Sequence, residues 1–213
     1  MDDTRWSGGA ALLLIDIIND LDSEQIDDLP RHANALVDPI LRLREEADAA
    51  DVPTIYVNDN FGDWHRDHGA IVQHCVERGG AAGEIADRLR PRERDLFVVK
   101  PQFSGFYATN LPVILPQLGV TRLILAGVSA DICVLFTAAD AHMREYDLWV
   151  PRDAVASTCE EHRDWALGIM AKSMAAEVRP TGELRLADWL APPDETAADG
   201  KARGEPQDEA AVH

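Results

Sequence analysis

Residues 121–134 read TRLILAGVSADICV, and this stretch predicts the class of the fold. Its first six residues form a largely apolar run, which is typical of a buried parallel strand. Residues 135–144 have a helical composition, and we expect their helix to open near Asp131, a good N-cap residue. Cys133 then lies in the first turn of a helix, beyond the carboxyl end of a strand. Open α/β sheets place their active sites at this position.

Two other apolar runs end in a charged residue. Residues 12–15 precede Asp16, and residues 96–99 precede Lys100. If these strands neighbour the strand before Cys133, the three side chains converge at one edge of the sheet. Lys100 and the positive end of the helix dipole are then expected to hold a thiolate, while Asp16 accepts the thiol proton and later donates it to a leaving amine. The alternative interpretations are an inert buried cysteine, a loop carboxylate and a surface lysine.

The rest of the chain alternates between strand-like and helical patterns. Strands are expected at 10–16, 52–57, 96–99, 121–126, 146–150 and 175–178. Helices are expected at 31–50, 71–78, 82–89, 111–118, 131–144 and 159–174, with a closing turn at 184–190. Pro39 falls inside the first of these helices, either in an early turn or at a kink. The alternation predicts an α/β, three-layer α/β/α, doubly wound fold around a mainly parallel six-stranded sheet.

The composition changes towards the end of the chain. Residues 1–190 are expected to form one domain, and residues 191–213 an acidic, low-complexity tail of Pro, Asp, Glu, Ala and Gly. Residues 19–29 are polar and acidic, and we interpret them as an exposed loop over the site.

Charge and cysteine content limit the partners and the compartment. The 213 residues carry a net charge of -18, which argues against nucleic acid and anionic membrane surfaces as partners. No apolar run is long enough to cross a membrane, and the N-terminus does not look like a signal peptide. Cys75, Cys133 and Cys159 are odd in number and lack C-x-x-C spacing, which indicates a cytoplasmic protein without disulfides.

The combined pattern consists of an Asp after the first strand, a Lys after the third, and a G-V-x-x-D-x-C-V segment at residues 127–134. In this pattern the chain resembles the cysteine hydrolases of the isochorismatase-like superfamily, over about residues 10–190. These include nicotinamidases and the hydrolases of N-carbamoylsarcosine, ureidoacrylate and maleamate. The resemblance implies an isochorismatase-like, Rossmann-like fold and hydrolysis of non-peptide C–N bonds in a small amide, ureido or carbamoyl compound. It also implies a thioester intermediate, no cofactor, and a homo-oligomer, either a dimer or a tetramer.

The same resemblance implies roles for individual residues. Cys133 corresponds to the nucleophile, Asp16 to the proton shuttle and Lys100 to the stabiliser of the charged pair. The backbone N–H groups of Ser129 and Cys133 correspond to the oxyanion hole, with a cis peptide bond between Val128 and Ser129. Isochorismatase itself lacks the nucleophilic cysteine, so Cys133 argues against vinyl-ether hydrolysis.

The resemblance breaks down at the metal-binding motif of the nicotinamidases, an Asp-x-His pair after the second strand. The matching residues here are Asp59, Asn60 and Phe61, so Phe replaces the first His. We therefore expect no metal in a solvated loop, and this departure argues against nicotinamide as the substrate. An alternative stays open, in which a shifted loop brings four residues to a metal. These are Asp59, Asp63, His65 and His68.

Seven residues with polar or aromatic side chains on loops or helix starts at this edge are candidates for substrate binding. They are Asn19, Asn60, Phe61, Trp64, Phe103, Tyr107 and Phe136. The alternative is that the aromatic side chains pack in a lid or the core. Two competing functions also remain: a non-catalytic homologue that binds a small molecule or a protein, and a thiol redox protein in which Cys159 approaches Cys133.

Overall fold

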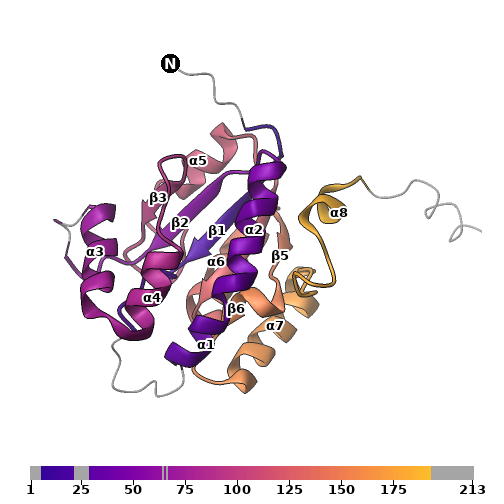
Figure 1. The fold of residues 1–213 in the computed structure, drawn as a ribbon. Helices are drawn as coiled ribbons and strands as arrows, with labels where there is room; N and C mark the ends of the chain where they lie inside the picture. The colour runs from indigo at the N-terminus through magenta and orange to yellow at the C-terminus, as the bar shows by residue number, and fades with distance from the viewer. Residues whose placement is uncertain (1–5, 22–28, 64, 66, 193–213) are drawn as a thin grey trace, which may run out of the picture.

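A six-stranded parallel sheet forms the middle of the molecule (Figure 1). The computed structural model describes residues 6–21, 29–63, 65 and 67–192. The strand order is β3-β2-β1-β4-β5, and β6 pairs with the end of β4. The strands are β1 (Ala10–Ile15), β2 (Thr54–Asn58), β3 (Leu96–Val99), β4 (Arg122–Val128), β5 (Asp147–Trp149) and β6 (Val155–Ala156). The order changes direction between β1 and β4, which is where such folds place their ligands.

Helices cover both faces of the sheet, as Figure 1 shows for α2 in front of the strands and α6 behind them. The α-helices are α1 (Leu29–Ala35), α2 (Val37–Ala49), α3 (His68–Arg78), α4 (Gly80–Arg88), α5 (Leu111–Gln117), α6 (Leu135–His142), α7 (Glu160–Met174) and α8 (Leu186–Leu190). A π-helical turn, η1 (Ala130–Val134), leads into α6, and a 3-10 turn, η2 (Arg152–Ala154), precedes β6. The predicted three-layer fold is confirmed.

The side chains of β1 contribute alternately to two hydrophobic cores. Leu12 and Leu14 pack with α1 to α4, whereas Leu13 and Ile15 pack with α5, α6 and α7. All of β1 is buried, so both faces of the strand need apolar residues, and the alternation expected of a half-exposed strand is absent. This explains the continuous apolar run in the sequence.

Two sequence-based boundaries were wrong. The helix expected at 31–50 is two helices, α1 and α2, and Pro39 lies in the first turn of α2, where a missing N–H costs no intrahelical bond. The sixth strand is β6 and not residues 175–178. Ala175 ends α7 with a φ of 53°, and the segment after it makes only an isolated bridge between Glu177 and Trp149.

Parts of three expectations lie outside the described residues: the tail from residue 193 onward, residues 22–28 of the acidic loop, and Trp64. The last described helix is α8, and the predicted domain boundary near residue 190 stays a prediction. None of the described helices is both long and apolar enough to cross a membrane.

Candidate active site

Asp16, Lys100 and Cys133 lie in contact at the carboxyl edge of the sheet. The Nζ of Lys100 is 2.7 Å from Oδ2 of Asp16 and 3.6 Å from Sγ of Cys133. Asp16 and Lys100 are buried, at 5% and 2% exposure. The prediction that these three side chains lie close together is therefore confirmed.

Lys100 reaches the other two residues across an intervening strand. The sequence argument assumed three neighbouring strands, but β2 lies between β1 and β3. The backbone N–H of Lys100 donates to the carbonyl of Asn58 at the end of β2, at 2.9 Å. Its side chain then spans the end of β2, and its Nζ also donates to the carbonyl oxygen of Gln102 at 3.1 Å.

The two carboxylate oxygens of Asp16 are held by the residues that follow β2 and β3. Its Oδ1 accepts a hydrogen bond from the Asp59 N–H at 2.8 Å, while its Oδ2 faces Lys100. The fully buried amide of Asn58 bonds to both the N–H and the carbonyl of Ile18, at 3.1 and 2.7 Å, and so fixes the turn that follows Asp16. Sequence reasoning missed Asn58, although a polar residue at the end of an apolar strand could have indicated it.

The turn that carries Cys133 begins earlier than predicted. Ser129, and not Asp131, occupies the N-cap position of η1, and the Val128–Ser129 peptide bond is cis, as predicted. Asp131 lies inside the first turn. Its carboxylate accepts hydrogen bonds from the hydroxyls of Ser129 and Ser157, the latter at 2.7 Å.

The Asp131 carboxylate connects this turn to Ser157, which follows β6, and to the first turns of α7. Its Oδ2 lies 3.4 Å from Nδ1 of His162. Burial opposes ionisation of Asp131, but the hydrogen bonds from Ser129 and Ser157 outweigh it and lower the carboxyl pKa. Sequence reasoning missed Ser157 and His162, because no local pattern connects them with a turn so far away in the chain.

A threonine fastens the loop after Lys100 to the helix of Cys133. The hydroxyl of Thr137, which is fully buried, donates to the carbonyl of Cys133 at 2.7 Å. The same oxygen accepts a hydrogen bond from the Gly105 N–H at 3.0 Å. The cation and the thiol are therefore held by connected elements.

The pKa shifts within the triad describe a neutral thiol beside an ion pair. Burial raises the pKa of Asp16, against the opposing charge of Lys100. Burial alone would lower the pKa of Lys100, but the charge of the Asp16 carboxylate beside it raises that pKa overall. Burial, and then the Asp16 carboxylate, raise the pKa of the Cys133 thiol to about 12. Burial therefore opposes the thiolate expected from the sequence, and the attraction of Lys100 does not offset this effect.

Two cavities, of about 240 and 430 Å³, open onto Asp16 and Cys133. Of the predicted substrate-binding residues, Asn19 and Phe103 line both cavities, and Phe61 lines the larger one. Ser129 and Cys133, whose backbone N–H groups are the expected oxyanion donors, both line the smaller cavity. Further wall residues that sequence reasoning missed are Asp20, Leu21, Leu29, Asp59, Pro101, Gln102, Val128 and Ile132.

Other predicted contact residues do not form the cavity walls. Asn60 is buried, and its side-chain oxygen accepts a hydrogen bond from Gly62 within its own turn. Tyr107 is 61% exposed and lines neither cavity. Phe136 is half-exposed and packs on Phe103 with ring centroids 5.8 Å apart, so it supports a wall without forming it. Trp64 lies outside the described residues.

The described residues do not fit the metal site of the nicotinamidases. Phe61 packs on the His74 ring at 5.3 Å. The Asp63 carboxylate accepts from the backbone of His65, and His68 packs on an aromatic ring of β3. In residues 6–21, 29–63, 65 and 67–192, no three His, Cys, Asp or Glu side chains group as ligands. The open alternative of a shifted loop thus gains no support, and activity without a metal stays a prediction.

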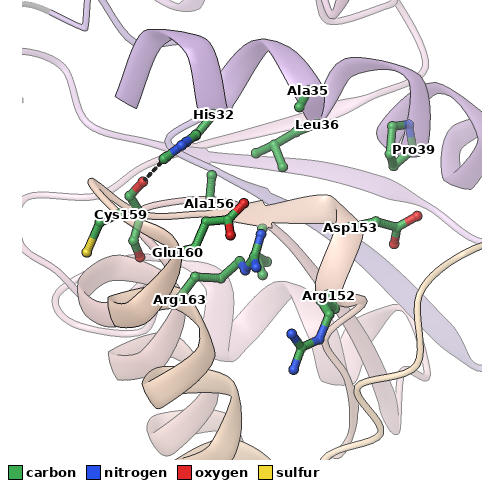
Figure 2. Close-up of a pocket in the computed structure, with 12 residues that line it drawn as sticks. His32, Ala35, Leu36, Pro39, Arg152, Asp153, Ala156, Cys159, Glu160 and Arg163 are labelled. Carbon is green, nitrogen blue, oxygen red and sulfur yellow. Dashed lines mark hydrogen bonds between the residues drawn. The ribbon is translucent and has the colours of Figure 1, made fainter. Parts of the chain in front are cut away.

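Another cavity of about 240 Å³ lies between α1, α2 and the start of α7 (Figure 2). His32 closes one side, with its Nδ1 3.2 Å from the carbonyl of Ser157. None of the triad residues lines this cavity, so we do not place the chemistry there. Cys159 does line it, whereas Cys133 faces the other two cavities. None of the three cysteines, all of which are described, forms a disulfide, so the redox alternative gains no support.

Comparison with known proteins gives the family of the chain and the same fold. Residues 10–182 match the family model described as the isochorismatase domain. YaaI of Bacillus subtilis, named an uncharacterized isochorismatase family protein, is 38% identical over 168 residues, which cover 79% of this chain and 92% of that protein. A probable inactive nicotinamidase of Arabidopsis thaliana is 31% identical over 167 residues, which cover 74% of this chain and 85% of that protein.

A solved structure with a similar fold is that of N-carbamoylsarcosine amidase from Thermoplasma acidophilum. It superposes with a TM-score of 0.62 and 30% sequence identity, covering 82% of this chain and 98% of that one.

Proposed function

Because the chain belongs to the isochorismatase family, we propose that it is a cysteine amidohydrolase that cleaves a non-peptide C–N bond in a small amide, ureido or carbamoyl compound. The observation that carries the proposal is the contact of Cys133 with the buried Asp16–Lys100 pair, at the base of two cavities. A relative of known fold, the N-carbamoylsarcosine amidase, is named for this class of reaction.

In the proposed first half-reaction, the Cys133 sulfur attacks the substrate carbonyl carbon while Asp16 takes the thiol proton. Asp16 is suited to this step because its raised pKa makes its carboxylate a stronger base than usual. The carbonyl oxygen becomes an oxyanion, for which we propose the backbone N–H groups of Ser129 and Cys133 as donors. Asp16 then returns the proton to the nitrogen, the C–N bond breaks, and ammonia or an amine leaves a thioester on Cys133.

In the second half-reaction, water replaces the amine. Asp16 removes a proton from water as the oxygen attacks the thioester carbon, and the sulfur leaves and recovers the proton. The carboxylic acid product departs, so that one water is consumed for each C–N bond broken. Lys100 stays charged throughout, since its pKa is raised, and balances the negative charge that moves between Asp16 and Cys133.

We also propose that residues 1–190 carry the activity, that the tail does not, and that the protein is a cytoplasmic homo-oligomer, either a dimer or a tetramer. Large apolar side chains left exposed in helices or at their ends support self-association, because an assembly can bury apolar area that the single chain leaves exposed. They are Ile132, Val113, Phe136, Met143 and Trp165. Light scattering that gives a monomer mass at micromolar concentration contradicts the oligomer.

The second candidate function is a non-catalytic binding homologue. The observation that favours it is the relative named as a probable inactive nicotinamidase. The intact contact of Asp16, Lys100 and Cys133 favours catalysis, because a binding scaffold needs neither a buried ion pair nor a nucleophile beside it.

The experiment that separates the two candidates is a panel of small amides, ureido acids and carbamoyl compounds, scored by release of ammonia. We expect the purified full chain to release ammonia from at least one class. If folded protein releases none from any class, the amidohydrolase proposal fails and the binding homologue replaces it.

A further inference from the structure

The side chain of Ser129 is bound to the carboxylate of Asp131. The Ser129 hydroxyl donates to Oδ1 of Asp131. A hydroxyl has a single proton to donate, so this hydroxyl has none left for a substrate oxygen while the bond is formed. The group through which Ser129 can stabilise an oxyanion is then its backbone N–H.

The carbonyl of Ser129 is bound to the turn that carries Cys133. Its oxygen accepts hydrogen bonds from the N–H of Ile132 at 3.2 Å and from the N–H of Val134 at 3.1 Å. The hydroxyl and the carbonyl of Ser129 are thus both engaged, which restricts the rotation of the residue. These bonds therefore set the direction in which its N–H points.

Ser157 reaches the same carboxylate from a different strand. β6 runs parallel to β4, with Ala156 opposite Val128. The residues that follow, Ser157 and Ser129, therefore lie side by side, with their hydroxyl oxygens 3.3 Å apart. The Ser157 hydroxyl donates to Oδ1 of Asp131 at 2.7 Å, and its oxygen accepts from the Asp131 N–H at 3.3 Å. Two hydroxyls from two strands thus meet at one carboxylate oxygen.

Ser157 is itself held in place. It is 1% exposed, and its carbonyl oxygen lies 3.2 Å from Nδ1 of His32 in α1. The hydrogen bonds that Asp131 accepts from Ser157 and Ser129 lower its carboxyl pKa, so Asp131 is an anion at neutral pH. Hydrogen bonds to an ionised acceptor are stronger than neutral ones. Ser157 and Asp131 therefore form a firm attachment for Ser129.

We infer that Ser157 and Asp131 are positioning residues, which hold Ser129 so that its backbone N–H points at the oxyanion formed beside Cys133. The inference rests on the proposed amidohydrolase function and adds to it the residues that set the geometry of the oxyanion site. Loss of the Ser157 hydroxyl weakens the stabilisation of the oxyanion, but leaves the Cys133 sulfur as reactive as before.

The test compares two reactions of the same sulfur, of which one forms an oxyanion. With p-nitrophenyl acetate, the Cys133 sulfur attacks the ester carbonyl carbon and an oxyanion forms. The C–O bond then breaks, and p-nitrophenolate leaves an acetyl group on the sulfur. With iodoacetamide, the sulfur displaces iodide in one step without an oxyanion. In both reactions the thiol proton is released to solvent.

Both rates are measured at early times by peptide mass at Cys133, and each is divided by the rate with free cysteine. The ratio of acetylation to alkylation then cancels differences in thiolate population and in access to the sulfur. In Ser157→Ala we expect this ratio to fall about tenfold or more, because a displaced donor loses part of its effect on the oxyanion. Ser157→Thr, which keeps a hydroxyl, should return the ratio close to the wild-type value.

Two further variants complete the set. Ser129→Ala removes the other hydroxyl but keeps the backbone N–H, and should lower the ratio as Ser157→Ala does. The double variant should lose little more than either single one, because both act through the same carboxylate. This pair decides the matter if Ser157→Thr does not fold. The matched control is Thr158→Val, which removes a neighbouring hydroxyl that lies 3.5 Å from Nδ1 of His162, and should leave the ratio unchanged.

Turnover provides a second readout. For an amide that the wild type hydrolyses, Ser157→Ala should lower kcat and leave KM nearly unchanged, because the oxyanion exists in the transition state and not in the bound substrate.

The outcomes separate the two proposals. If the ratio falls in Ser157→Ala but no amide is hydrolysed, the positioning role stands and the amidohydrolase proposal fails. If amides are hydrolysed and the ratio in Ser157→Ala equals that of the wild type, the positioning role is overturned and the amidohydrolase proposal stands. An equal fall of both rates, an equal fall of the ratio in Thr158→Val, or no acetylation of Cys133 in the wild type also overturns the positioning role.

Discussion

The Nζ of Lys100 lies 2.7 Å from Oδ2 of Asp16, and neither side chain is more than 7% exposed. A buried ion pair is costly to desolvate and is a poor source of stability by comparison with apolar packing. Stability therefore does not account for the pair. We attribute it to the chemistry of the Cys133 thiol, whose sulfur lies 3.6 Å from the Nζ of Lys100.

Breaking the pair on one side should destabilise the fold. Lys100→Met leaves the buried Asp16 carboxylate unpaired, and we expect the free energy of unfolding to fall by about 3–5 kcal/mol. The double variant Asp16→Asn/Lys100→Met should regain most of this stability, because no buried charge is left, yet remain inactive. Urea unfolding and turnover of the same samples measure both. Additive losses of stability in the double variant would show that the two residues do not act as a pair.

The reactivity of Cys133 should depend on pH. Asp16 raises the pKa of the Cys133 thiol and Lys100 lowers it, so removing the one or the other should shift the pH dependence in opposite directions. With a thiol pKa near 12, alkylation by iodoacetamide should rise about tenfold per pH unit between about pH 7 and pH 9. The Asp16 carboxylate disfavours the thiolate, so Asp16→Asn should lower the pKa of Cys133 and speed alkylation at a given pH, while abolishing turnover. Lys100→Met should slow alkylation. A rate for the wild type that is flat over this range would mean that the thiolate is already formed.

Gly127 should not tolerate a side chain. It pairs with Ile15 in the sheet at a φ of 125°, and an added Cβ would lie 2.0 Å from the Ile15 carbonyl oxygen. Gly127→Ala should therefore separate β1 from β4 and destabilise the fold severely, with loss of activity. The control is Gly168→Ala in the exposed middle of α7, where nothing lies within 4 Å of the added Cβ. That variant should gain about 0.5–1 kcal/mol. Equal stability of the two variants would contradict the close approach.

Chelation should leave turnover unchanged. The position that would supply the first histidine of a metal site holds Phe61, whose ring packs on His74. We expect dialysis against a chelator, followed by assay with and without zinc, iron or manganese, to give equal rates. Loss of turnover that one of these ions restores would contradict this prediction, and would make Asp59, Asp63, His65 and His68 the ligands to test.

The contact of Asp16, Lys100 and Cys133 could be predicted because each residue follows the carboxyl end of an apolar run. Parallel strands have their carboxyl ends at the same edge of the sheet, so residues that follow three such strands lie at one edge, independently of how the connecting helices pack. The sequence argument predicted the correct edge of the sheet but the wrong neighbouring strands, since β2 separates β1 from β3 and the long side chain of Lys100 reaches Asp16 across it.

Other features depend on quantities that the sequence does not contain. The raised pKa of Cys133 follows from burial, which is known only after the chain has packed. Ser157 and His162 reach Asp131 from a segment remote in sequence. The two-residue strand β6 is too short for any pattern. Asp20 was within reach of the sequence argument, because it follows Asn19 in the same turn.

The most direct test of the account is the turnover of Cys133→Ala with an amide that the wild type hydrolyses. Alanine is tolerated in the first turn of a helix, so we expect this variant to keep the wild-type melting temperature. Its kcat/KM should fall by about 10⁴-fold or more, because no other group can form the thioester. A folded Cys133→Ala that retains a rate close to that of the wild type would contradict the assignment of Cys133 as the nucleophile, and with it the proposed mechanism.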